Sequence, residues 1–234
     1  MILTETKLWY FGAAMILFAV FTGVLSAFFN SLTAEAIQPA PFMRLTFVQT
    51  VEQVNEIVGK EDGAREGLKR FLLWDSAAFV PLYSAFFIAI SFLLASKQAA
   101  WASAAAKILV FAAIIAAASD LIENYNSYLA LSDKTEYISR IYWAAHVKWL
   151  AIFIVTGLAS AIFLRFSWWG IAGATMLAAS ILGLILIATS LLGSIKIIEH
   201  HQVITAALGL QLLALLIVGV CLMTGLRQNF FKGY

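Results

Sequence analysis

Residues 99–126 read AAWASAAAKILVFAAIIAAASDLIENYN, an alanine-rich apolar run that ends in two carboxylates and two amides. A helix of about 20 apolar residues can cross roughly 30 Å of hydrocarbon. Small side chains also allow helices to approach one another closely in lipid. The stretch therefore predicts a membrane-spanning helix over about 99–121, placed at the centre of a helical bundle, with a polar group of residues at its end.

Helical spacing indicates which face of this predicted helix points into the bundle. Residues that recur at intervals of three to four lie on one face of a helix. On one such face, a stripe of side chains is small within the apolar run and polar at its end. Its members are Ala113, Ala116, Ala117, Asp120, Glu123, Asn124 and Ser127. Small and polar groups together favour contact with protein over contact with lipid. We expect this stripe to face the inside of the bundle.

The composition of the whole chain fits a membrane environment. Of its 234 residues, 62% are hydrophobic and 12% are charged, and the mean hydropathy is +0.91. Soluble domains have roughly 45–50% apolar and about 25% charged residues. The alternating segments of about 10 residues that build membrane β-barrels are missing from the sequence. The sequence predicts an all-α fold: a polytopic integral membrane helical bundle that forms a single domain, 1–234.

Six apolar runs are predicted to span the membrane. Besides 99–121, they cover about residues 8–29, 74–95, 142–164, 168–192 and 203–226. Tryptophans and tyrosines near the predicted ends fit the aromatic belts of membrane interfaces. Pro81, within the second run, has no N–H for the carbonyl of Ala77 and predicts a kink.

An amphipathic segment separates the first two runs. Apolar residues recur at three-to-four spacing over 43–58 among Gln, Glu and Asn, which predicts one amphipathic helix. This helix fits two positions, either flat on the membrane surface or capping the bundle. In both positions it would cover the half of the bilayer that holds the polar candidates and would act there as a lid.

Counting the spans places the candidate site residues in one half of the bilayer. Six spans put both termini on the same side, with the cytoplasm as the preferred side. The amphipathic segment and the links before the fourth and sixth spans then share the opposite face. Gln211 joins the candidates because it lies about three helical turns from His200. The candidate binding residues are Asp75, Asp120, Glu123, Asn124, His146, Lys148, His200 and Gln211.

The charged candidates have either a functional or a structural interpretation, and the free-energy cost of burying charge bears on both. An ionised carboxylate at membrane depth costs at least a few kcal/mol unless it is paired, neutralised or hydrated. Lys148 is the predicted partner of Asp120 or Glu123. The pair is either part of a functional polar site or a structural ion pair that only fixes helix packing. Asp75 also fits an interfacial residue at a helix start, the histidines fit interfacial positions, and Tyr83 fits a packing residue.

Several classes of site and partner are not predicted. The net charge is +2 and no basic run is present, so nucleic acid is not an expected partner. Cys221 is the single cysteine, which excludes an intrachain disulfide and a Cys-based metal cluster. No metal site is predicted because His200 and His201 are adjacent and do not share a helical face. No cofactor is implied, no motif assigns a family, and no serine lies in a recognisable nucleophile setting.

Three function classes remain open, with membrane lipids and other membrane subunits as the expected partners. The first is binding or transport of a lipid, amphiphile or ion in a one-sided polar pocket. The second is an intramembrane lipid-modifying hydrolase in which His146 or Glu123 acts as general base. The third is a structural or assembly subunit of a membrane complex. A cavity at Asp120, Glu123 and Lys148 would favour the first two, and direct burial of these groups against one another would favour the third.

Overall fold

The computed structural model describes residues 5–32, 41–95, 100–164, 170–192 and 201–223. These residues are helical apart from short turns, and no strand occurs among them. Six stretches within them are long and apolar enough to cross a membrane, judged by length and composition. The predicted fold class, an all-helical membrane bundle, is confirmed.

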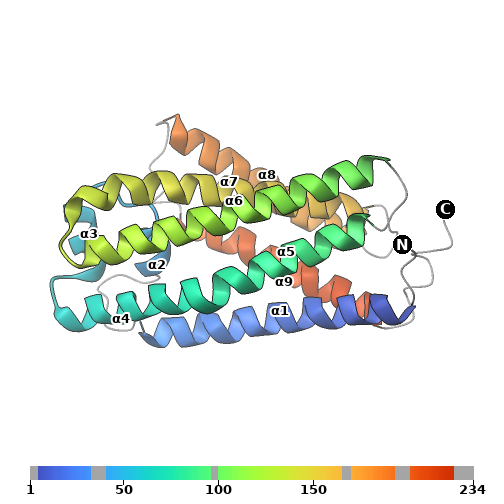
Figure 1. Cartoon of the computed structure of the whole chain (residues 1–234), viewed down its shortest axis with the longest axis horizontal. Coiled ribbons are helices and arrows are strands. Elements are labelled where there is room, and N and C mark those ends of the chain that lie inside the picture. Colours follow the sequence, from blue (N-terminus) through green and yellow to red (C-terminus); the bar gives the residue numbers. More distant parts are fainter. Residues whose placement is uncertain (1–4, 33–40, 96–99, 165–169, 193–200, 224–234) are drawn as a thin grey trace.

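The long helices run side by side along the long axis of the molecule (Figure 1). Their bounds are α1 Glu5–Leu32, α4 Asp62–Trp74, α5 Val80–Ala95, α6 Ala100–Leu131, α7 Ile138–Leu164, α8 Gly170–Leu191 and α9 His201–Met223. Each helix from α5 to α8 packs against the next one along the chain. The last helix, α9, packs against both α8 and α1. Since α1 also contacts α5, the contacts close into a ring of helices.

Helix α6 continues to Leu131, whereas the sequence predicts that the third span ends near Leu121. No glycine or proline interrupts residues 122–131, so nothing in the local sequence breaks the helix. The backbone changes direction only at Asp133, where φ is 63°. The polar residues 120–126 therefore lie inside a helix and not in a link. Ala113 and Ala116 are fully buried, as the predicted stripe requires.

The second span contains a π-helical segment, η1 (Asp75–Phe79), between α4 and α5. The Val80 N–H bonds to the carbonyl of Asp75, five residues back. Pro81 follows directly and has no N–H to donate, so the regular α-helical pattern does not pass unchanged through this point. The distortion that the sequence predicts as a kink at Pro81 takes the form of a π turn just before it.

The segment between α1 and α4 forms two short helices, α2 (Pro41–Leu45) and α3 (Val51–Val58), where the sequence predicts one helix over 43–58. A capping box causes the break. The Thr50 hydroxyl accepts a hydrogen bond from the Gln53 N–H, and the Gln53 side chain accepts one from the Thr50 N–H. These bonds satisfy the first donors of a new helix, so the chain turns between Leu45 and Val51.

The apolar face of α2 and α3 is buried against the bundle. It forms a second hydrophobic core with the end of α1, with α4, and with the turn between α6 and α7. Leu45, Val48, Val54 and Ile57 are all buried in this core. Of the two predicted positions, the structure shows the one in which the segment caps the bundle. We call residues 41–58 the cap.

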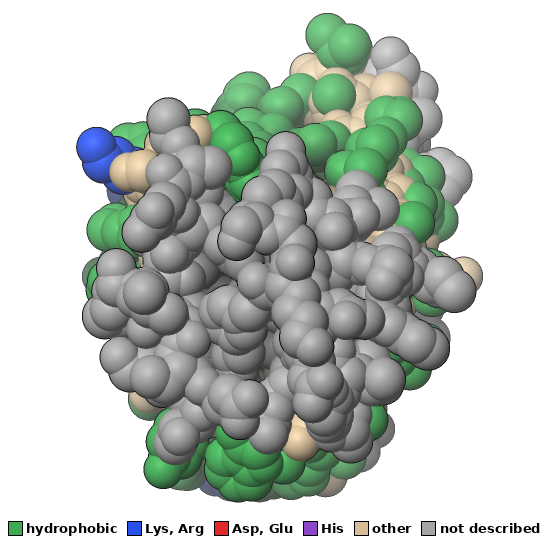
Figure 2. Space-filling model, turned by 90° about the vertical axis from the view of Figure 1, so that its right-hand side faces the viewer, with side chains coloured by type: hydrophobic (Ala, Val, Ile, Leu, Met, Phe, Trp, Pro, Cys, Tyr) green, Lys and Arg blue, Asp and Glu red, His purple; other side chains and the backbone are tan. Residues whose placement is uncertain are grey.

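The cap marks one end of the molecule, together with the end of α6 and the starts of α4 and α7 (Figure 1). Figure 2 shows the opposite end. Among the described side chains seen there, hydrophobic groups dominate with basic ones at the edge, and no acidic or histidine side chain is visible. This distribution agrees with a polar site that lies toward the cap.

Gly183 in α8 provides a test of the packing between α7 and α8. A Cβ atom at Gly183 would overlap the ring of Phe153, which is fully buried. We expect Gly183→Ala to lower the free energy of unfolding by about 1–3 kcal/mol, because overpacking strains a close-packed core. Gly209→Ala is the control, since a Cβ there meets nothing within 4 Å. Thermal unfolding in detergent measures both variants, and equal melting temperatures would contradict this packing.

Candidate functional site

Lys148 of α7 lies between two carboxylates of α6. Its Nζ is 3.0 Å from Oδ1 of Asp120 and 2.6 Å from Oε2 of Glu123, and the three side chains are only 4–8% exposed. The shorter contact is an ion pair without the geometry of a hydrogen bond. Asp120 and Glu123 can reach one lysine because residues three apart share a helical face. The predicted ion pair is present and includes both candidate carboxylates.

Hydroxyl groups from two other parts of the chain bind the remaining carboxylate oxygens. The Tyr83 hydroxyl of α5 donates to Oδ2 of Asp120 at 3.0 Å. The Thr46 hydroxyl, in the turn between α2 and α3, donates to Oε1 of Glu123 at 2.7 Å. Tyr83 is thus a hydrogen-bond donor as well as the packing residue that the sequence predicts. Thr46 was not among the sequence candidates, because nothing in its local sequence points to α6.

Asp75 and Asn124 extend this group of residues toward η1. The Asn124 side-chain amide donates to Oδ2 of Asp75 at 2.7 Å and to Oγ of Ser76 at 3.1 Å. Asp75 is 8% exposed, whereas its neighbour Trp74 is 52% exposed. Asp75 therefore points into the bundle. We call Asp75, Asp120, Glu123, Asn124 and Lys148 the Lys148 cluster.

The Lys148 cluster lies well inside the helices. At 1.5 Å per residue, Asp120 and Glu123 are roughly 12–17 Å from the end of α6, and Lys148 is about 15 Å from the start of α7. The second hydrophobic core and the cap lie between the cluster and that end of the molecule.

The carboxyl groups of the Lys148 cluster outnumber its ammonium group. Within the described residues, the ion pairs of this cluster are all made by Lys148, and Asp75 is held by an amide. Three ionised carboxylates beside one lysine would leave a net negative charge in a buried site, which is costly at membrane depth. The arrangement therefore favours binding of positive charge. Over the described part of the chain, no group of three or more His, Cys, Asp or Glu is placed to hold a metal ion.

His146 has partners other than the Lys148 cluster. Its Nδ1 lies 2.7 Å from the carbonyl oxygen of Tyr142, and its Nε2 lies 2.9 Å from Oγ of Ser190 in α8. The imidazole is 1% exposed, so the histidine is buried within the protein. The sequence places His146 in the same site as Lys148, but the structure gives it a separate hydrogen-bonded group.

Gln211 of α9 also belongs to a different group. Its side-chain amide donates to Thr156 at 3.0 Å and to Ser180 at 3.3 Å, which ties together α7, α8 and α9. These hydrogen bonds satisfy the buried amide, as burial in an apolar core requires. The predicted association of Gln211 with the carboxylates is not observed. His200, the candidate paired with it, lies outside the described residues.

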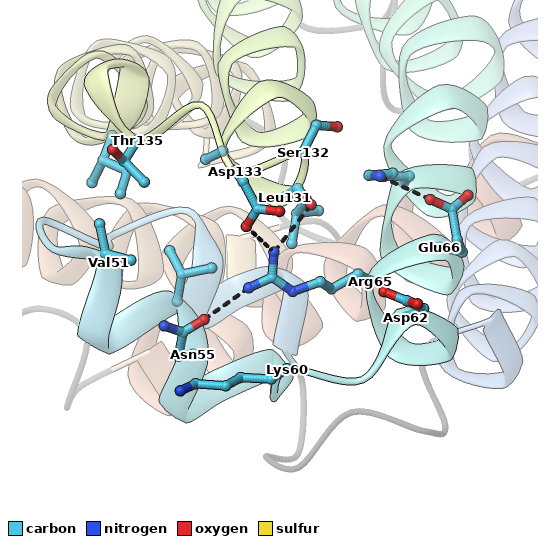
Figure 3. A pocket seen from close by; sticks show the side chains of 14 residues that line it. Val51, Asn55, Lys60, Asp62, Arg65, Glu66, Leu131, Ser132, Asp133 and Thr135 are labelled. Carbon is cyan, nitrogen blue, oxygen red and sulfur yellow. Dashed lines mark hydrogen bonds and ion pairs between the residues drawn. The ribbon is translucent and has the colours of Figure 1, made fainter.

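A cavity of about 760 Å³ lies at the surface where α3, α4 and the turn between α6 and α7 meet (Figure 3). Arg65 extends along it and donates to Asp133 at 2.7 Å and to Asn55 at 2.8 Å. Acidic and basic side chains both line its walls, among them Asp62 and Lys60. Because the Arg65 guanidinium already donates hydrogen bonds to Asn55 in the cap and to the Leu131 carbonyl at the end of α6, we interpret it as a structural link between the cap and α6.

Comparisons with protein-family models, with curated proteins and with solved structures find no match for this chain. The fold and the site define a class only: a helical membrane bundle with a buried cluster of carboxylates and one lysine. What the protein does is argued below from the chemistry of its buried groups.

Lys148→Met tests how strongly the Lys148 cluster depends on its cation. We expect this variant to lose about 3–5 kcal/mol of stability, because it leaves buried carboxylates without a counter-charge. Adding Asp120→Asn should recover part of the loss, since one of the two paired charges is then removed. Chemical unfolding in detergent measures these changes.

The matched control is Glu66→Gln, which breaks the ion pair of Lys69 with Glu66 in α4 on the side of the Glu66 carboxylate, which is 56% exposed. Surface pairs contribute about 0–1 kcal/mol, so this variant should remain close to the parent protein. Equal losses for Lys148→Met and Glu66→Gln would show that the buried pair is not a special contributor to stability.

Proposed function

We propose that this membrane protein binds protons at the Lys148 cluster and uses them in a binding or transport function. The observation that carries the proposal is the excess of carboxyl groups: Asp75, Asp120 and Glu123 are all buried in a cluster with one ammonium group, which pairs with Asp120 and Glu123. Ionisable residues inside membrane helices commonly mark ion pathways and proton relays. A proton is the smallest carrier of positive charge that such a closely packed site can accept.

Asp75 is the carboxyl group best suited to carry the exchanged proton. Asp120 and Glu123 each have the Lys148 ammonium on one oxygen and a hydroxyl donor on the other. Within the described part of the chain, the hydrogen-bond partner of Asp75 is the neutral amide of Asn124, which donates to Oδ2. A buried carboxyl group without a cation is more stable as the neutral acid. Gain or loss of a proton at Asp75 would therefore change the charge of the cluster as a whole.

The cap offers a route by which proton binding would be coupled to a movement. Thr46 is the only cap residue that we find hydrogen-bonded to the Lys148 cluster among the described residues, through Oε1 of Glu123. A proton gained or lost at Asp75 changes the electric field at the nearby Glu123 carboxylate and thereby the strength of this bond, because hydrogen bonds to charged acceptors depend on their electrostatic surroundings. The cap would then open or close toward one face of the bilayer, which is the lid role expected from the sequence.

Direct packing of the polar groups favours a proton over a lipid headgroup or amphiphile. A headgroup would have to displace Tyr83, Thr46 or Asn124, each of which already binds a carboxylate. Lipids, or another membrane subunit, remain expected partners on the outside of the bundle. Exposed apolar side chains such as Leu17, Phe111 and Leu213 would provide that surface.

A structural or assembly subunit is the second candidate function, and the same direct packing supports it. In that case the Lys148 cluster would only fix the register of α6 and α7, and its protonation state would not change under working conditions. The two candidates differ in one property, which is whether a buried carboxyl group exchanges a proton in the folded protein.

Infrared difference spectroscopy of the protein in lipid vesicles measures that property. A pH step should produce a change in the carbonyl stretch of protonated carboxylic acids, and Asp75→Asn should remove it with little loss of stability, because Asn is nearly isosteric with the neutral acid. Asp133→Asn is the matched control, since Asp133 is 86% exposed in its pair with Arg65. If the signal is absent, proton binding at this cluster is ruled out and the structural role is left. If the signal is the same in Asp75→Asn as in the parent protein, Asp75 is ruled out as the proton carrier.

A further inference from the structure

A second buried group, formed by His146 of α7 and Ser190 of α8, has the geometry of an activated nucleophile. The Tyr142 carbonyl oxygen, 2.7 Å from Nδ1 of His146, can only accept a hydrogen bond. The neutral imidazole must therefore carry its proton on Nδ1, which leaves the lone pair of Nε2 free. Nε2 then accepts a hydrogen bond from the Ser190 hydroxyl, 2.9 Å away.

The direction of the Ser190 hydroxyl differs from that of other hydroxyls in the bundle. Ser84, Ser180 and Thr189 each donate to a carbonyl four residues earlier in their own helix. The described hydrogen bonds of Ser190 instead cross to α7: Oγ pairs with His146, and it also lies 3.3 Å from the Tyr142 hydroxyl. A serine held against an unprotonated imidazole nitrogen, with the other nitrogen fixed by an acceptor, is the arrangement that nucleophilic catalysis needs.

We propose that Ser190 is a nucleophile activated by His146 as general base, and that it takes the acyl group of a lipid ester. The hydroxyl oxygen would attack the ester carbonyl while its proton moves to Nε2 of His146. The bond from the carbonyl carbon to the alcohol oxygen then breaks, and the leaving alcohol takes the proton from His146. Water attacks the acyl-serine in the same way, which releases the fatty acid and restores the serine.

The aromatic residues beside the pair, and its place near the end of α8, favour lipid esters as the substrate class. Ser190 lies one residue before the end of α8, and His146 lies one helical turn from Tyr142 and Trp143. Trp143 is 60% exposed, and tryptophan and tyrosine favour the boundary between headgroups and hydrocarbon. The ester groups of membrane lipids occupy that same boundary. A soluble ester would not be concentrated there.

The cap covers this pair in the structure. The ring of Phe47, in the turn between α2 and α3, lies with its centroid 5.6 Å from that of His146. Ser190 is 4% exposed and His146 is 1% exposed, so a substrate reaches them after a movement of neighbouring groups, and Phe47 of the cap is one of these. Phe47 follows Thr46 directly, and the same turn therefore touches both buried groups. The proposal does not depend on proton binding at the Lys148 cluster, since the two groups use different side chains.

Labelling with a lipid-like alkyl fluorophosphonate tests the proposal on the full chain in phosphatidylcholine vesicles. The probe forms a stable bond with an activated serine, and mass spectrometry of the labelled protein locates the adduct without the need for a variant. We expect the adduct on Ser190, no labelling in Ser190→Ala, and about 10²-fold slower labelling in His146→Gln, the size of a typical general-base contribution. Phe47→Ala should label faster because it uncovers His146.

Thr189→Ala is the matched control, because it removes the neighbouring hydroxyl, which bonds only within α8 in the described residues. It should label at the parent rate. Far-UV circular dichroism and size-exclusion chromatography establish that each variant is folded. An adduct at another residue, undiminished labelling of Ser190→Ala, or no labelling of both the parent protein and Phe47→Ala would overturn the proposal.

Discussion

The ion pairs of Lys148 with Asp120 and Glu123 are the constraint on which the rest of the structure depends. A charge in the low-dielectric interior has to meet its partners at short range, whereas apolar side chains accept many arrangements. Once α6 and α7 are aligned by these pairs, the outer oxygens of the two carboxylates are placed to accept from Tyr83 and Thr46. The hydrophobic packing of the bundle supplies stability, and the polar contacts select one arrangement of the helices.

The alanine stripe of α6 makes this arrangement possible. Ala113 and Ala116 are fully buried and lie one to two turns before Asp120 on the same face. Small side chains there allow α5 and α7 to come close enough for Tyr83 and Lys148 to reach the same carboxylate. Larger side chains in these positions would separate the helices, and the buried charges would lose their partners. Packing and electrostatics are therefore coupled along one face of one helix.

The sequence predicts those parts of the site that depend on local pattern or on charge balance. The inward stripe of α6 follows from helical spacing, and the pairing of Lys148 follows from the cost of an isolated charge in a membrane. The hydroxyl donors do not follow, because Thr46 is 77 residues from Glu123 and Tyr83 is 37 residues from Asp120. Their contacts depend on the capping box at Thr50 and on the π turn at Asp75, which change the direction of the chain. Ser190 is missed for the same reason, since its histidine is 44 residues away and hydroxyls are common in membrane helices.

The π turn at η1 makes the length of this stretch as important as its composition. One extra residue in a helix turns everything before it by about 100° relative to everything after it. Helix α4, which packs in the core beneath the cap, and helix α5, which carries Tyr83, are set at their relative angle by this single residue. Among related chains, substitutions at residues 77–79 would be absorbed locally. Loss or gain of one residue there would rotate the cap side of the helix as a unit, so residues 77–79 should vary in sequence far more readily than in length.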